Sequence, residues 1–153
     1  MVSKFIIGFV GLLSVQAFAC QWPDNTPAPA DRAREILTAC DRINDERRYA
    51  GLDDLILDGR LIVVAQGHAQ DMSDRNYFSH VSPEGWRVFD RLRAYGMPFW
   101  SAGENIAIGE SSAWQVMNDW MGSPGHRANI LGQSFRRVGM GLWNYRWVQV
   151  FSD

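Results

Sequence analysis

The stretch Gly122-Ser-Pro-Gly-His126-Arg-Ala-Asn-Ile-Leu131 places a histidine between the start of a predicted helix and an apolar anchor. Ser123 belongs to the residue types that favour the position before a helix, and Pro124 suits the first helical position. His126 would then lie in the first turn of a short helix. The apolar pair 130–131 would hold that helix against a core.

Two other segments carry polar side chains that could meet His126. Residues 77–80 read Tyr-Phe-Ser-His, and residues 103–107 read Gly-Glu-Asn-Ile-Ala. A glutamate between a glycine and an apolar run is expected to be partly buried, and a buried carboxylate needs partners. We therefore expect His80, Glu104 and His126 to meet in one cleft.

Length and composition fit a single soluble domain. The chain has 153 residues, of which 46% are hydrophobic and 21% charged, and it carries seven Trp, eight Phe and four Tyr. Such a length can bury a sizeable core. The formal net charge of −2 gives no general attraction to nucleic acid or to anionic membranes. We therefore expect no nucleic-acid partner.

The N-terminus has the pattern of a secretory signal peptide over residues 1–19. Lys4 gives a positive start, 5–15 are apolar, and 17–19 read Ala-Phe-Ala, the small-x-small form of a cleavage site. The apolar run is shorter than the roughly 20 residues that span a bilayer. We expect a secreted or periplasmic protein cleaved after residue 19. The alternative is a membrane anchor through a lipidated Cys20.

Cys20 and Cys40 are the only two cysteines. In an oxidising compartment they could form a disulfide, which the loop-entropy estimate makes worth about 3 kcal/mol. Two alternatives remain open. Cys40 could be a free, buried residue, because it shares a predicted apolar helix face with Ile36, Leu37 and Ile43. A lipidated Cys20 would also exclude the bridge.

Hydrophobic periodicity predicts helices followed by strands. After an irregular leader at 20–31, the pattern indicates helices at about 32–49, 59–76, 86–95 and 111–121, then strands at 137–143 and 146–151. Asp31 and Asp58 are the expected caps of the first two helices, and 52–57 and 103–107 are expected to be extended. His68 lies on an apolar helix stripe and is expected to be a core residue. This order favours an α+β sandwich over a parallel βαβ sheet, with one domain at 32–153.

The motifs together resemble the CAP/SCP superfamily, the group of cysteine-rich secretory, antigen 5 and pathogenesis-related-1 proteins. In chain order they are Asn44-x-x-Arg47, Ala69-x-Asp71-Met72, Tyr77-Phe-Ser-His80, Gly103-Glu-Asn-Ile-Ala107, Trp120-Met-Gly-Ser-Pro-Gly-His126-Arg-x-Asn129-Ile-Leu131 and Val138-Gly-Met-Gly141. Their joint order and spacing are most similar to short bacterial members. The resemblance implies a three-layer α-β-α sandwich with a central antiparallel sheet.

The resemblance also implies a cleft with two histidines and two acidic residues. His80 and His126 match the histidines, and Glu104 matches the acid of the Gly-Glu-Asn motif. Ser123 stands where many relatives carry the second acid. The nearby acids Asp119 and Glu110 are not at the matching position, so the four-residue set is incomplete.

Several kinds of chemistry are open to these three residues. Two imidazoles can bind Zn²⁺, which makes His80 and His126 candidate metal ligands. Glu104 is a candidate ligand, partner of a histidine or general base. The helix N-terminus should favour a neutral His126. The same groups could instead form a hydrogen-bonded network that only stabilises the fold.

Three functions follow as hypotheses. The first is a secreted, non-enzymatic binding module whose cleft takes a small lipid-like ligand or a peptide, with or without a divalent metal; lipid binding among relatives implies it. The second is a metal-assisted hydrolase or peptidase. The third is a cell-surface protein that acts through its exterior. A cysteine nucleophile is not expected, since neither cysteine lies in a cleft motif, and Ser79 and Ser123 are poorly placed to act on neighbouring histidines.

Overall fold

The computed structural model describes residues 19–26 and 30–153, without the side chains of residues 30 and 31. The predicted signal peptide therefore lies outside the described residues apart from its last position, as does the part of the leader at 27–29. The elements are α1 (Ala30–Tyr49), β1 (Ile56–Leu57), α2 (Gly59–Asp74), α3 (Val88–Ala94), β2 (Ala102–Ile108), α4 (Ala113–Gly122), α5 (Pro124–Ile130), β3 (Arg137–Trp143) and β4 (Arg146–Ser152).

The strands form one sheet in the order β1-β3-β4-β2. β3 and β4 are an antiparallel hairpin, and β2 pairs antiparallel with β4. Asn144 and Tyr145 form the hairpin turn with φ of 44° and 56°, as the two central residues of a type I′ turn require. β1 is too short to show in hydrophobic periodicity, and it adds a parallel edge beside β3. The predicted antiparallel core of the sheet is confirmed, with this one parallel addition.

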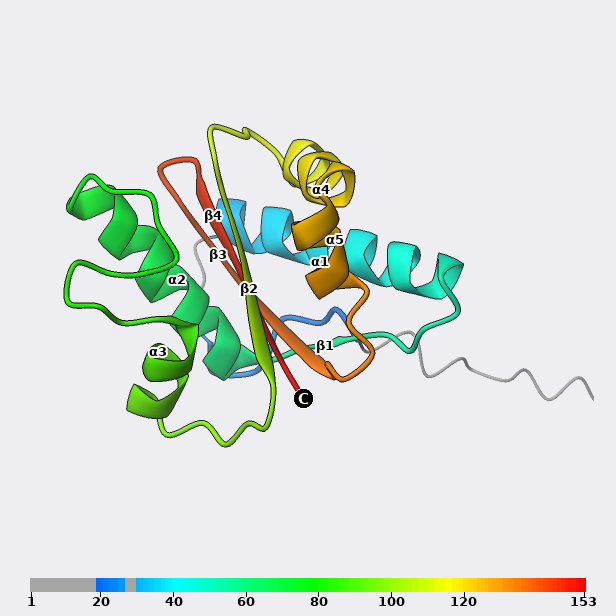
Figure 1. The fold of residues 1–153 in the computed structure, drawn as a ribbon. Coiled ribbons are helices and arrows are strands. Elements are labelled where there is room, and N and C mark those ends of the chain that lie inside the picture. Colours follow the sequence, from blue (N-terminus) through cyan, green and yellow to red (C-terminus); the bar gives the residue numbers. More distant parts are fainter. Residues whose placement is uncertain (1–18, 27–29) are drawn as a thin grey trace, which may run out of the picture.

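Helices cover both faces of the sheet, so the predicted three-layer sandwich is confirmed (Figure 1). One apolar cluster joins α1, α4 and α5 to the sheet and includes the buried residues Ile43, Trp120 and Ile130. The other joins α2 and α3 to the opposite face and includes Leu61 and Leu92. Both clusters arise from the helical spacing of apolar residues.

Helix ends follow the local capping chemistry. The Asp58 side chain accepts hydrogen bonds from the backbone of Arg60 and Leu61, as expected for the cap of α2. Ser112 caps α4 in the same way. The prediction of Asp31 as the first cap was wrong, because α1 already begins at Ala30. α2 and α3 are also shorter than predicted.

The N-terminal segment is attached to α1 by a disulfide. Cys20 and Cys40 are bonded, with their Cα atoms 5.7 Å apart. The Ala19 carbonyl also accepts a hydrogen bond from the Leu57 amide at 2.8 Å. The alternative of a free Cys40 is therefore wrong, and a bonded Cys20 has no thiol to carry a lipid. None of the helices in the described ranges is long and apolar enough to cross a membrane.

Candidate functional site

Glu104 is the centre of the candidate site. It lies in β2, and only 3% of its side chain is exposed. Its Oε1 atom lies 2.9 Å from His80 Nδ1, and its Oε2 atom accepts a hydrogen bond from Arg91 Nη2 at 2.6 Å. Each carboxylate oxygen thus has a polar partner, as a buried carboxylate requires. Of the three residues expected in one cleft, His80 and Glu104 are therefore in direct contact.

Arg91 was missed by the sequence analysis. It lies in α3, which packs beside β2 (Figure 1), and its side chain is 9% exposed. Besides Glu104, its guanidinium donates to the carbonyls of His80 at 3.3 Å and Trp86 at 3.1 Å. Only its spacing from Val88, on the inner face of α3, could have signalled burial. One guanidinium therefore joins the carboxylate to the loop that carries His80.

His68 lies beneath this pair, on α2. Its side chain is 1% exposed, and its Nε2 atom lies 3.0 Å from the Ser79 carbonyl and 4.0 Å from Glu104 Oε1. Burial lowers the pKa of His68, and the Arg91 charge lowers it further, against the opposite effects of Glu104 and Asp71. The prediction of a hydrogen-bonded core histidine is confirmed. Its contact with the Ser79 carbonyl holds the loop that carries His80 against α2.

His126 is brought towards Glu104 by a network of amides. Asn105, the residue after Glu104, donates to the His126 carbonyl at 3.1 Å. Asn129, one turn after His126 on α5, donates to the Glu104 carbonyl at 3.2 Å and to Asn105 Oδ1 at 2.8 Å. Gln149 completes the network through Asn105 at 2.9 Å. The Gly-Glu-Asn and His-Arg-x-Asn motifs thus attach α5 to β2.

The imidazole of His126 is electrostatically coupled to that of His80. Burial lowers the pKa of His126, and the His80 charge lowers it further. A lowered pKa was expected, although from the helix N-terminus. At neutral pH the ring of His126 is therefore uncharged, and one of its nitrogens can accept a hydrogen bond.

The remaining candidates do not complete a metal site. Ser123 is the residue before α5, as predicted, but its side chain makes no capping hydrogen bond. Glu110 follows the end of β2, and Asp119 is exposed on α4. Among the described residues, no group of three or more His, Cys, Asp or Glu side chains could hold a metal ion. His80 and His126 therefore belong to no such group in the part of the chain that the structure describes.

A hollow of about 280 Å³ lies between α2 and the loop before α3, and His68 and Arg91 are among the residues that line it. At its rim, Arg75 forms a two-pronged ion pair with Glu84, with contacts of 2.9 and 2.5 Å. The Arg75 guanidinium lowers the pKa of Glu84 to about 2. The loop that carries His80 therefore contacts α2 through Glu84 and contacts Glu104 through His80.

Stability should fall in mild acid because of His68. The folded pKa of His68 lies below its ordinary value of 6.5, so below about pH 6.5 the unfolded chain binds a proton that the folded chain does not. We expect the free energy of unfolding to decrease from pH 7 to pH 5, by up to about 1.4 kcal/mol per pH unit. Urea unfolding at both values should show a shallower pH dependence for His68→Gln. An equal dependence in both proteins would contradict the assignment.

Comparison with known proteins identifies the relatives of this chain. The profile of the Cysteine-rich secretory protein family (CAP) matches residues 40–151. The chain is 39% identical over 116 residues to the uncharacterized protein YkwD of Bacillus subtilis, covering 76% of this chain and 45% of that protein. It is 36% identical over 111 residues to the uncharacterized membrane protein YlbC of the same organism, covering 72% and 32%. The chain thus spans less than half the length of these two relatives.

Solved bacterial structures share the fold. An extracellular SCP-domain protein from Bacillus anthracis aligns with a TM-score of 0.77 and 34% identity, covering 82% of this chain and 44% of that one. A cysteine-rich secretory protein from Staphylococcus aureus aligns with a TM-score of 0.71 at 15% identity, covering 81% and 40%, and so shows the fold alone. With its α-β-α sandwich and its His80–Glu104 pair on the matching motifs, the chain belongs to the CAP family of cysteine-rich secretory proteins.

Proposed function

We propose that this domain is an exported binding module that holds a small apolar ligand or a peptide against His80 and His126. One observation carries the proposal. The buried carboxylate of Glu104 fixes Nδ1 of His80, while 52% of the His80 side chain is exposed. A histidine oriented by a buried carboxylate presents its other ring nitrogen outward, in the arrangement typical of liganding histidines.

The surroundings favour an apolar partner. Phe78 and Trp86 lie on the same loop as His80 and are 45% and 48% exposed. Exposed aromatic side chains beside a fixed polar group are common at binding sites, where apolar contact gives affinity and the polar group gives orientation. Because burial lowers the pKa of His126, its imidazole offers a hydrogen bond rather than a charge at physiological pH.

Recognition is favoured over hydrolysis by the donor set. Catalytic zinc sites use three protein ligands and one open position, whereas the described residues contain no group of three or more His, Cys, Asp or Glu side chains that could hold a metal ion. Glu104 already binds Arg91 and His80 with its two oxygens, so it fits the role of orienting His80 better than that of a ligand or base. Zinc bound by the two histidines would add a Lewis-acidic contact for a ligand carboxylate or carbonyl.

The three histidines allow a direct test by NMR. The imidazole C–H signals of His80, His126 and His68 can be assigned with single substitutions and followed while zinc, octanoate and a short apolar peptide are added in turn. We expect the signals of His80 and His126 to shift with at least one additive, while that of the buried His68 moves little. Unchanged His80 and His126 signals with all three would contradict the proposal.

A further inference from the structure

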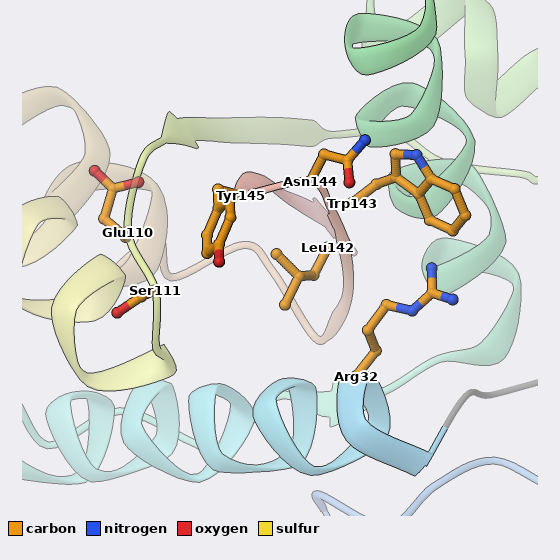
Figure 2. A pocket seen from close by; sticks show the side chains of 7 residues that line it. All are labelled: Arg32, Glu110, Ser111, Leu142, Trp143, Asn144 and Tyr145. Carbon is orange, nitrogen blue, oxygen red and sulfur yellow. The ribbon is translucent and has the colours of Figure 1, made fainter.

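A second hollow lies at the other end of β2 from Glu104 (Figure 2). Glu104 pairs with Val150, whereas Ile108 pairs with Arg146 beside the hairpin turn. The step of four residues from Glu104 to Ile108 along β2 corresponds to a distance of about 13 Å. The volume of about 390 Å³ is within the range of roughly 300–1,000 Å³ typical of ligand pockets. Its lining includes Arg32, Glu110, Ser111, Leu142, Trp143 and Tyr145.

One side of this hollow carries a positive charge. The guanidinium of Arg32 lies 4.4 Å from the centre of the Trp143 ring. Stacking uses the face of the guanidinium and leaves its edge N–H groups for a further partner. Among the side chains that the structure describes, no carboxylate forms an ion pair with Arg32. Figure 2 shows the Glu110 carboxyl group across the hollow, directed away from Arg32.

The rest of the lining is mixed: Leu142, Trp143 and Tyr145 are apolar or aromatic, whereas Glu110, Ser111 and Asn144 are polar. In the view of Figure 2 the rings of Trp143 and Tyr145 lie on either side of Leu142. Leu142 packs against the cluster of α1, α4 and α5 and Trp143 against that of α2 and α3, so these two neighbours leave β3 on opposite faces. Tyr145 has the left-handed backbone conformation of the hairpin turn, with a φ of 56°. This backbone sets the position from which the Tyr145 side chain projects. Rigid aromatic walls lose little conformational entropy when they hold a planar ligand.

We propose that this hollow binds a small planar organic anion, such as an aromatic carboxylate. Its ring would lie against the apolar and aromatic part of the lining, and its carboxylate would accept charge-assisted hydrogen bonds from Arg32. The proposal does not depend on the function of His80 and His126, because the two places share no residue.

The test uses 1-naphthoate as the probe and its neutral analogue 1-naphthalenemethanol as the control ligand. The seven tryptophans give seven indole N–H signals, and Trp143→Phe identifies the one at the hollow. We expect 1-naphthoate to shift the Trp143 signal in a saturable way. Arg32→Met should weaken the affinity about tenfold or more, because a charge-assisted hydrogen bond is lost.

A matched pair elsewhere on α1 controls for a general loss of charge. Arg42 stacks on Trp114 at 4.1 Å, so Arg42→Met removes the same kind of contact away from the hollow. This variant should bind 1-naphthoate as the parent protein does. The proposal would be overturned if the neutral analogue bound with equal affinity or if the Trp143 signal did not shift. It would also be overturned if Arg32→Met had no effect on affinity, or if Arg42→Met weakened binding as much as Arg32→Met.

Discussion

Gly139→Ala and Gly141→Ala are each expected to destabilise the domain by about 3 kcal/mol or more. A Cβ atom at Gly139 would lie less than 3.0 Å from the backbone of Leu61 and Ile62, and one at Gly141 equally close to the backbone of Ala65 and Gln66. Backbone atoms in the middle of a helix cannot move aside as a flexible side chain can. α2 would therefore have to lift away from β3, opening the core beneath it.

The measurement is thermal and urea unfolding of each variant. For a domain of this size, a loss of 3 kcal/mol lowers the melting temperature by roughly 6–12 °C. Gly122→Ala is the matched control, because its Cβ atom would meet nothing within 4 Å and its backbone lies in α4. This control should leave stability unchanged or slightly increased. Normal stability of both sheet variants would show that α2 does not lie this close to β3.

These two glycines illustrate how far a sequence can predict this fold. The alternation of apolar residues along β3 and β4 indicated a hairpin, and the Val138-Gly-Met-Gly141 motif marked β3. Neither pattern shows that a helix backbone rests on the glycines, because that contact depends on residues about 75 positions away along the chain. Local periodicity therefore predicts elements, while the packing distance between them comes from tertiary structure.

The candidate site shows the same division. Ser123 and Pro124 predicted a helix that starts before His126, and the structure contains it. The docking of that helix through Asn105 and Asn129 could not be predicted, because both amides sit in segments where exposed polar residues are common. Burial of an amide depends on the whole network being satisfied.

Arg91 was invisible for a related reason. A charged residue in a seven-residue helix is normally exposed, and its neighbour Arg93 has the exposed position that sequence alone suggests for both. Burial of Arg91 is possible because the carboxylate of Glu104, on β2, forms an ion pair with its guanidinium. A pairing of charges across two distant segments leaves no local pattern, so the Gly-Glu-Asn motif indicates the carboxylate but not its guanidinium partner.

Arg91→Met is expected to cost about 3 kcal/mol or more, since removing one partner of a buried ion pair leaves the other charge uncompensated. Glu104 would keep only its contacts with the two histidines, His80 and His68. The carbonyls of His80 and Trp86 would lose their donor. Urea unfolding at pH 7 measures the loss. Arg93→Met is the matched control, because Arg93 is 67% exposed and its surface pair with Asp90 contributes little.

The double variant Arg91→Met/Glu104→Gln distinguishes the charge from the shape of the side chain. If the buried charge is responsible, neutralising Glu104 should recover part of the stability lost in Arg91→Met, so the two substitutions together should cost less than their sum. An additive result would mean that Arg91 acts mainly through its carbonyl contacts and packing. A cost for Arg91→Met no larger than for Arg93→Met would contradict both roles, and with them the view that α3 holds Glu104 in position for His80.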